Sequence, residues 1–234
     1  MLSSYSREAL KKVSTATLTT VLFKRGLRNV FIQGIFLLNR YAPRMVGEAF
    51  TLRYIPARED VDQLGAFEGR GHAQREAIEA CPPGHVLVMD ARRDASAATG
   101  GDILMTRLMV RGVSGVVTDG GLRDSPTIEK LDWPAYCGAR SAPLNLVRHH
   151  AVESQVPIGC GGVAVYPGDV LVGDAEGVVV IPAKMAEEVA KEAQAQTEFE
   201  DWVEAKVKEG RSIFGLYPPN AETKAEFEAY KKRR

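Results

Sequence analysis

Compact apolar runs alternate with helix-like stretches through the middle of the chain, and this alternation narrows the possible folds more than any other feature. His85–Asp90 (HVLVMD) and Val113–Thr118 (VSGVVT) have the length and composition of buried strands, and Asp102–Arg111 (DILMTRLMVR) between them is helical in character. A second helix is expected after the second strand, with Ser125 as its N-cap and Pro126 as its first residue. This order predicts an α/β fold with a partly parallel sheet.

The segments before this region add further elements. The apolar spacing predicts a helix over Tyr5–Arg25, a strand over Met45–Ile55, a loop or short helix over Pro56–Gly71 and a helix over His72–Ala80. These elements extend the same α/β pattern toward the amino terminus.

The last third of the chain has a different texture. Short apolar runs separated by glycine, proline and aspartate predict a meander of hairpins over Pro157–Pro182. Apolar residues at steps of four predict a long helix over Ala183–Glu209. We therefore expect one domain over residues 1–234, of which about residues 183–234 form a C-terminal helical arm and tail.

Charge and cysteine usage exclude several classes of protein. Thirty basic residues balance thirty acidic ones, so the chain lacks the basic excess typical of nucleic-acid binding. The three cysteines are far apart and contain no CxxC pair, which argues against a disulfide framework and fits a cytoplasmic protein. No apolar run approaches the roughly 18 residues that a membrane helix needs, so no membrane partner is expected.

Two glycines, Gly100 and Gly101, precede the predicted helix over Asp102–Arg111. Glycine lets a ligand approach the backbone closely, and the first amide groups of a helix have no partner within the helix. These donors and the positive end of the helix dipole suit a carboxylate. Glycine pairs also occur in ordinary turns that precede a helix, so this segment alone does not identify a site.

A second glycine pair lies in Asp119–Asp124 (DGGLRD), directly after the strand that ends at Thr118. Ligands of open α/β sheets collect beyond the carboxyl ends of the strands. Arg123 can hold a planar carboxylate or enolate through paired hydrogen bonds, and Asp124 is a suitable ligand for Mg²⁺ or Mn²⁺. A local salt bridge between these two residues is an equally simple interpretation, and Asp119 could brace the turn.

The stretch Gly100–Asp124 (GGDILMTRLMVRGVSGVVTDGGLRD) resembles the signature of the RraA-like family, and Ser14–Leu22 and Val156–Pro182 are similar to other parts of that family. The family includes aldolases for 4-hydroxy-4-methyl-2-oxoglutarate and 4-carboxy-4-hydroxy-2-oxoadipate, which also decarboxylate oxaloacetate. The resemblance implies a swivelling α/β/β sandwich-type fold with mixed sheets. It also implies a homotrimer or homohexamer whose active sites lie between subunits.

A role for each residue of the predicted site follows from the same resemblance. Asp124 is the direct ligand of the divalent metal, and Arg123 holds the oxo and carboxylate oxygens of the substrate. Asp102 holds the metal through water. The backbone amides of Gly101, Asp102, Ile103 and Leu104 bind the substrate carboxylate.

The resemblance assigns one further acidic residue to the C-terminal helix of a neighbouring subunit. We place it at Glu200, which would hold the metal through water, with Glu198 as the alternative. Glu200 borders the apolar stripe through Phe199 and Val203, and a stripe on an arm docks as readily on a neighbour as on its own domain. A solvated glutamate in an acidic run is an equally good interpretation.

Together these residues predict a divalent-metal-dependent carbon–carbon lyase, an aldolase or decarboxylase that cleaves a small 4-hydroxy-2-oxo acid through a pyruvate enolate. Arg123 and Asp102 would be its catalytic residues. The motif contains no lysine, which disfavours a Schiff-base route.

Two alternatives remain open. The loop Pro56–Gly71 and the tail after Ser212 look longer than in typical aldolases, which would fit a related hydratase or lyase for a 2-oxo acid derived from a sugar acid. The second alternative is an RraA-type regulator that binds a ribonuclease. In that type an amide replaces the acid at the position of Asp102, so the aspartate here favours an enzyme.

Other residues have chemistry but no assigned role. Three histidines are among them, namely His72, His149 and His150. If the last two lay on a helix they would point about 100° apart and seldom share an ion, so packing roles are favoured for them. Polarity alone suggests a pocket mouth formed by Arg53, Arg58, Asp60 and Asp62. Core or turn positions are expected for Cys81, Cys137 and Cys160.

Overall fold

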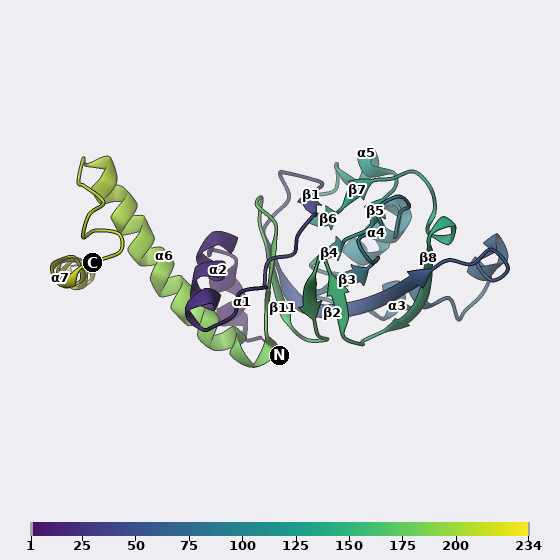
Figure 1. Cartoon of the computed structure of the whole chain (residues 1–234), viewed down its shortest axis with the longest axis horizontal. Coiled ribbons are helices and arrows are strands. Elements are labelled where there is room, and N and C mark those ends of the chain that lie inside the picture. Colours follow the sequence, from purple (N-terminus) through teal and green to yellow (C-terminus); the bar gives the residue numbers. More distant parts are fainter. Residues whose placement is uncertain (1, 234) are drawn as a thin grey trace.

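An eight-stranded mixed sheet forms the centre of the computed structural model, which describes residues 2–233 (Figure 1). Met1 and Arg234, the ends of the predicted domain, lie outside the described residues. Neighbouring strands follow the order β1 (Phe36–Leu37), β6 (Ala135–Cys137), β4 (Gly115–Thr118), β3 (His85–Asp90), β2 (Met45–Pro56), β11 (Val170–Gly173) and β12 (Val178–Ile181). The eighth strand, β8 (His149–Ser154), pairs with the far half of β2.

The middle of this sheet is parallel. β2 pairs with β3, β3 with β4, and β4 with β6 in the parallel sense, whereas the outer strands β1, β8, β11 and β12 are antiparallel to their neighbours. This arrangement confirms the predicted mixed α/β fold. Because parallel strands end at the same edge, the register of Met89 with Thr118 brings the segments after β3 and β4 together.

Helices cover the sheet in two groups. One apolar cluster packs α3 (Ala73–Ala80) and α4 (Asp102–Val110) against the parallel strands, next to the short helix α5 (Ser125–Ile128). Another joins α1 (Ser4–Leu10), α2 (Thr15–Lys24) and the first half of α6 (Ala186–Lys208) to β11 and β12. The second group therefore lies at the opposite end of the molecule from α4 and α5 (Figure 1).

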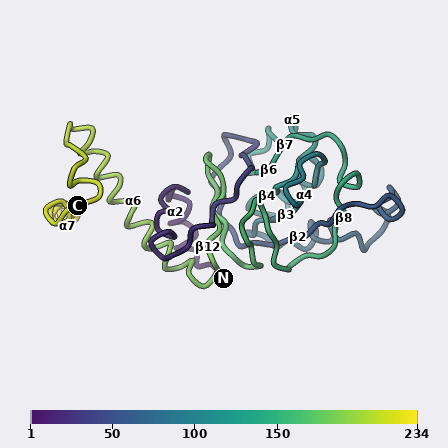
Figure 2. The backbone as a smooth tube through the Cα atoms, in the orientation of Figure 1, coloured from purple at the N-terminus to yellow at the C-terminus, as the bar shows by residue number. Residues whose placement is uncertain are grey.

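The predicted single helix over Tyr5–Arg25 is wrong, because the chain forms α1 and α2 with a break between them. Ser14 causes the second start: its hydroxyl accepts a hydrogen bond from the amide of Thr17 at 3.0 Å. The amide and hydroxyl of Thr15 both donate to the Asp174 carboxylate at 2.8 Å. The break turns α2 so that it lies beside α6 (Figure 2).

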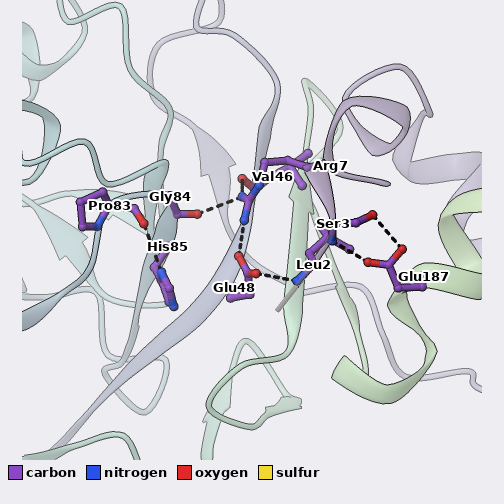
Figure 3. Close-up of polar contacts among 9 residues, drawn as sticks. All are labelled: Leu2, Ser3, Arg7, Val46, Glu48, Pro83, Gly84, His85 and Glu187. Carbon is purple, nitrogen blue, oxygen red and sulfur yellow. Dashed lines mark hydrogen bonds and ion pairs between the residues drawn. The ribbon is translucent and has the colours of Figure 1, made fainter. Parts of the chain in front are cut away.

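Polar contacts fasten the start of the chain to two distant elements (Figure 3). Arg7 on α1 forms an ion pair with Glu48 on β2 and donates to the carbonyl oxygens of Val46 and Gly84 at 2.9 and 3.0 Å. On the other side, the backbone amide of Ser3 donates to the Glu187 carboxylate at 2.6 Å. These contacts hold α1 between the sheet and α6.

The predicted meander over Pro157–Pro182 is confirmed as two hairpins. β9 (Ile158–Cys160) and β10 (Val163–Val165) form a separate two-stranded sheet, and β11 and β12 extend the main sheet. A third apolar cluster packs β9 and β10 against the main sheet. The remaining short elements are η1 (Leu64–Phe67), β5 (Gly121–Leu122), β7 (Ala139–Arg140), η2 (Asn145–Val147) and η3 (Ala183–Met185).

The predicted C-terminal helix is confirmed as α6, which runs outward from the body of the molecule (Figure 1). At its outer end α7 (Ala221–Lys231) folds back against it, as a separate apolar cluster of Trp202, Val203, Leu216 and Phe227. None of the helices within residues 2–233 combines the length and apolar character needed to cross a bilayer.

Candidate active site

The two glycine-rich segments singled out in the sequence meet at the carboxyl edge of β3 and β4. The Arg123 amide donates to the Gly100 carbonyl oxygen at 3.0 Å. A Cβ atom on Gly101 would lie 2.7 Å from the Asp124 Oδ2 atom and 3.0 Å from the Arg123 Cγ atom. Only glycine fits here without moving those side chains, so the start of α4 and the Arg123–Asp124 pair form one structural unit.

A cavity of about 320 Å³ opens beside this unit. Its walls include Gly101, Asp102, Ile103 and Leu104 at the start of α4, together with Arg123 and Asp124. The structure therefore brings all the predicted site residues of the body of the molecule into one pocket.

The glycines after β4 permit close packing between segments. A Cβ on Gly120 would lie 2.6 Å from the Ala91 Cβ, and one on Gly121 would lie 2.5 Å from the Ser141 Cβ. Neither glycine has a positive φ angle, so backbone freedom is not the reason for them. Their small size lets the loop after β3 lie directly against the DGGLRD segment.

Asp119 braces this packing. Its buried carboxylate accepts hydrogen bonds from the backbone amides of Ala91, Arg93 and Gly161 at 2.7, 3.1 and 3.0 Å. Burial raises the pKa of the Asp119 carboxyl, and the amide hydrogen bonds oppose that shift. Asp119 therefore fixes the loop that carries the pocket and lies behind it.

Asp124 adopts the left-handed backbone conformation, with φ of 55° and ψ of 31°. Aspartate tolerates this region better than most residues, but the surroundings must still enforce it. Asp124, instead of the predicted Ser125, is the N-cap of α5, and its carbonyl oxygen accepts from the amide of Thr127 at 2.9 Å. The strained residue is thus held between the Gly101 backbone and the first turn of α5.

The start of α4 offers unpaired amide donors to the cavity. The Ile103 amide donates to the Asp102 Oδ1 atom at 2.8 Å. Within residues 2–233, no protein group accepts a hydrogen bond from the amides of Gly101, Asp102 or Leu104. These three donors at a helix N-terminus are available to an anion, as the sequence predicts.

Arg123 and Asp124 also pair with each other, as the alternative interpretation of the sequence predicts. The Arg123 Nε atom lies 3.2 Å from the Asp124 Oδ2 atom, and both side chains are about two-fifths exposed. An ion pair this open contributes only about 0–1 kcal/mol to stability. A ligand can therefore replace it at little cost.

The donor set decides which metal ion would fit. Within residues 2–233 no group of three or more histidine, cysteine, aspartate or glutamate side chains converges as a metal site. Two carboxylates, those of Asp102 and Asp124, line the cavity. A hard cation that retains several waters and takes one or two carboxylates fits this set, whereas a zinc-type cage of protein ligands does not.

Glu200 does not line this cavity within the same chain. It lies on α6, far from α4 and α5 (Figure 1). Its carboxylate accepts hydrogen bonds from the Thr17 hydroxyl at 2.7 Å, the Gln196 amide at 2.9 Å and the Tyr217 hydroxyl at 3.2 Å. Glu198 is exposed. A contribution from a neighbouring subunit stays a prediction for both residues.

The residues chosen by polarity for the pocket mouth do not line the cavity. Arg53 pairs with Glu153, Arg58 with Asp60, and Asp62 with His150. The other walls come instead from Leu64, Phe67, Gln74, Arg75, Ala98, Gly100, Leu144 and Asn145. Half of these residues are apolar and lie in loops or short helices, so polarity could not identify them.

The histidine pair lies on strand β8, not on a helix. His149 is fully buried, and its ring nitrogens contact the Ala97 carbonyl oxygen and the Arg92 guanidinium, both at 3.2 Å. Burial lowers the pKa of His149. The favoured packing role is thus confirmed for His149, which supports the loop between β3 and α4.

The cysteines are buried, as expected. Burial raises the pKa of the thiols of Cys81 and Cys137 to about 12 and that of Cys160 well above its usual value. Thiols that remain protonated are poor nucleophiles, so none of the three is suited to covalent catalysis.

Comparison with known proteins identifies the family. The family model described as "RraA-like: Aldolase/RraA" matches residues 15–180, which include every element around the cavity. The chain belongs to the RraA-like family. A protein of Halalkalibacterium halodurans named "Putative 4-hydroxy-4-methyl-2-oxoglutarate aldolase" is 37% identical over 134 residues, which are 56% of this chain and 63% of that protein. The chain thus matches somewhat under two thirds of that relative.

Solved structures of other proteins share the fold. An uncharacterized protein of Pseudomonas syringae pv. tomato has a TM-score of 0.80 and 26% identity, over 92% of this chain and 94% of its own. Streptomyces coelicolor RraAS2, described as an unusual member of the RNase ES inhibitor RraA protein family, has a TM-score of 0.76 and 29% identity, over 86% of this chain and 96% of its own. RraA-like proteins named as aldolases and as ribonuclease inhibitors are therefore both similar to this chain.

Proposed function

We propose that this protein is a divalent-metal-dependent carbon–carbon lyase that cleaves a small 4-hydroxy-2-oxo acid to release pyruvate. The observation that carries the proposal is the meeting, in one cavity, of the free amides at the start of α4 with the Arg123 guanidinium and two carboxylates. The relatives named as aldolases support the same reaction class.

The near end of the substrate binds through this chain's own donors. The amides of Gly101, Asp102 and Leu104 receive the carboxylate, and Arg123 donates hydrogen bonds to the 2-oxo oxygen. When the C3–C4 bond breaks, its electron pair forms the enolate, and the negative charge grows on the oxygen beside the guanidinium. Arg123 therefore stabilises the transition state more than the bound substrate.

Proton transfer falls to Asp102. Its Oδ1 atom accepts from the Ile103 amide, which leaves Oδ2 without a hydrogen bond within residues 2–233. This oxygen can orient a water that takes the proton from the 4-hydroxyl group as the C4 carbonyl forms. Protonation of the enolate at C3 then completes pyruvate. A divalent cation on Asp124, with Asp102 and a neighbouring subunit's Glu200 acting through water, would supply Lewis-acid stabilisation of the same oxygen.

The test is pyruvate release from 4-hydroxy-4-methyl-2-oxoglutarate and from oxaloacetate, measured with lactate dehydrogenase as coupling enzyme. We expect turnover with Mg²⁺ or Mn²⁺ and its loss with a chelator. Absence of pyruvate above background from both compounds with either metal would refute the proposal.

A ribonuclease-binding role is the competing function, because the likeness to RraAS2 covers most of both chains. It predicts that the purified protein retains a ribonuclease in a pull-down and that Asp124→Ala leaves this binding intact. The acidic side chain of Asp102 in the cavity favours the enzyme.

A further inference from the structure

One buried side chain in the wall of the cavity has no part in the proposed reaction. Gln74 is the second residue of α3, is only 2% exposed and lines the cavity. Its side-chain nitrogen donates a hydrogen bond to the backbone carbonyl oxygen of Thr99 at 2.5 Å. Thr99 directly precedes Gly100 and Gly101, so Gln74 contacts the backbone where it enters the segment that presents the free amides.

A second buried donor reaches the same carbonyl oxygen from another element. The Tyr54 hydroxyl, on β2, lies 3.3 Å from the Thr99 oxygen and 3.6 Å from the Met89 Sδ atom. A hydroxyl has one hydrogen, so it can donate to only one of these two acceptors at a time. The shorter contact from Gln74 therefore contributes more to holding the Thr99 oxygen in place.

The direction of the Thr99 carbonyl determines how the following residue is oriented. A peptide group is planar, so fixing the Thr99 C=O bond also fixes the Gly100 N–H bond in the same plane. On the other side of Gly100, its carbonyl oxygen accepts from the Arg123 amide at 3.0 Å. Glycine has a wide choice of backbone angles, so these contacts are what keep Gly100 in one conformation.

Packing alone does not account for an amide side chain at this position. Ala77 and Ile78, on the same buried side of α3, belong to the apolar cluster beneath the helix. Burial of an amide costs free energy that its hydrogen bonds must offset. The Thr99 oxygen also has Tyr54 as a donor, so satisfying that oxygen does not require Gln74.

We propose that Gln74 is a positioning residue, which holds the Thr99–Gly100 peptide plane and thereby keeps the free amides at the start of α4 directed at a bound carboxylate. That carboxylate belongs to the substrate of the proposed function, on which this inference rests. Gln74 contacts no reacting atom in this role. Its loss should therefore weaken carboxylate binding and have little effect on the chemical step.

Affinity for pyruvate tests this role without any turnover. Gln74→Met removes the donor and keeps a side chain of similar length. By calorimetry with Mg²⁺ present, we expect pyruvate to bind this variant roughly tenfold more weakly than the natural protein, about the effect of losing one hydrogen bond to a charged group. Tyr54→Phe should weaken binding less, because Gln74 still holds the Thr99 oxygen. Affinity for Mg²⁺ alone should be unchanged in both variants, since neither alters a carboxylate.

Asn39→Leu is the matched control. Asn39 is also a buried residue whose side-chain amide donates to a backbone carbonyl oxygen, that of Leu131, and it does not line this cavity. Asn39→Leu and Gln74→Met should both lower the melting temperature, but only Gln74→Met should weaken pyruvate binding. The proposal is overturned by equal affinities in Gln74→Met and the natural protein, by equal losses in the two variants, or by a natural protein that does not bind pyruvate.

Gln74→Glu supplies a readout that a purely structural role would not change. An ionised carboxylate cannot donate to the Thr99 oxygen, whereas a protonated carboxyl group can. Burial raises the pKa of a carboxyl group, so the donor returns as the pH falls. The affinity of this variant for pyruvate, divided by that of the natural protein at the same pH, should therefore rise from pH 8 to pH 5.5. A constant ratio would contradict the proposal.

Turnover of 4-hydroxy-4-methyl-2-oxoglutarate separates this inference from the proposed function. Gln74→Met should raise KM and leave kcat nearly unchanged, because the substrate carboxylate is bound alike in the ground state and the transition state. If neither this compound nor oxaloacetate yields pyruvate but pyruvate affinity depends on Gln74 as expected, the lyase proposal fails and the positioning role stands. If pyruvate forms and Gln74→Met changes neither the affinity nor KM, the positioning role fails and the lyase stands.

Discussion

Individual residues of the pocket combine strain, close packing and unsatisfied donors. Asp124 has a left-handed backbone, Gly101 leaves no room for a methyl group, and three amides at the start of α4 have no acceptor among residues 2–233. None of these features benefits the stability of the isolated chain. Such costs are typical of sites built to hold a ligand.

Arg123→Ala is expected to remove activity and preserve the fold. Its ion pair with Asp124 is exposed, so the melting temperature should hardly change. Loss of the donor at the developing enolate oxygen should lower kcat about 100-fold or more, as for an oxyanion-hole donor. Pyruvate release and a thermal melt measure the two effects. Arg107→Ala, which removes an arginine paired with Glu79, is the control, and similar losses in both variants would contradict the role of Arg123.

Gly101→Ala tests the close approach of α4 to Asp124. The added methyl group would lie 2.7 Å from the Asp124 Oδ2 atom and push that carboxylate and Arg123 aside. Gly101 has a φ of −125°, so alanine adds no backbone strain. We expect at least a roughly tenfold loss of kcat/KM, as small displacements of catalytic groups are costly. Gly159→Ala, where none of the atoms of residues 2–233 lies within 4 Å of the new methyl group, should keep full activity.

Among the secondary-structure elements, the parallel strands decide where the pocket forms. β3 and β4 end side by side. Asp119, in the loop after β4, accepts a hydrogen bond from Ala91 in the loop after β3, and His149 on β8 contacts Ala97 in that same loop. The pocket is therefore as rigid as these connections between elements.

Asp119→Asn should destabilise the whole junction. The carboxylate accepts from three backbone amides through two oxygens, and an asparagine nitrogen cannot accept. One or two buried amides would lose their partner, at about 1–3 kcal/mol in the free energy of unfolding. Urea denaturation gives the value. Asp132→Asn, a change at an exposed position, should stay within about 0.5 kcal/mol of the natural protein, and equal stability of the two variants would show that Asp119 is not a brace.

The β8 connection makes stability depend on pH. Burial lowers the pKa of His149 in the folded protein, so the unfolded chain binds the proton more readily. The free energy of unfolding therefore falls as the pH drops below the unfolded value of about 6.5, by at most about 1.4 kcal/mol per pH unit for one proton. His72 is shifted in the same direction and adds to the slope.

Denaturation at pH 7.0, 6.0 and 5.5 measures that slope. His149→Gln removes one of the two titrating groups, so its stability should depend less steeply on pH even if it is lower throughout. An unchanged slope in His149→Gln would mean that His149 titrates normally in the folded protein.

The whole molecule has a body that holds the pocket and an arm that extends from it (Figure 1). The arm has its own apolar cluster around Trp202 and Phe227, whose rings lie 5.4 Å apart, and this cluster shares no residue with the clusters of the body. The outer part of the arm can therefore open without unfolding the sheet.

Phe227→Ala should loosen the arm alone. We expect faster proteolytic cleavage between α6 and α7, because α7 loses its main apolar contact with α6. The principal thermal transition of the body should remain within a few degrees of that of the natural protein. Leu108→Ala, on the buried face of α4, should instead lower that transition clearly. Cooperative loss of the whole structure in Phe227→Ala would show that arm and body fold as one unit.

Local sequence patterns were enough to predict the parallel core and the C-terminal helix, and the family resemblance of Gly100–Asp124 implied the cluster around Gly101 and Arg123. Strand and helix periodicities depend on neighbouring residues, and parallel strands necessarily end at one edge, so the two glycine-rich segments had to meet. The family signature lies in the same stretch. The amino-acid sequence by itself therefore determines where the pocket lies.

Contacts between residues that are far apart in the sequence determine the other features of the structure. The break before Thr15 depends partly on Asp174, 159 residues away, and the lining of the cavity includes both Arg75 and Asn145. The partners of Glu200 come from α2 and from the segment before α7. Such pairings depend on the tertiary packing of the helices and strands, and no local periodicity encodes them.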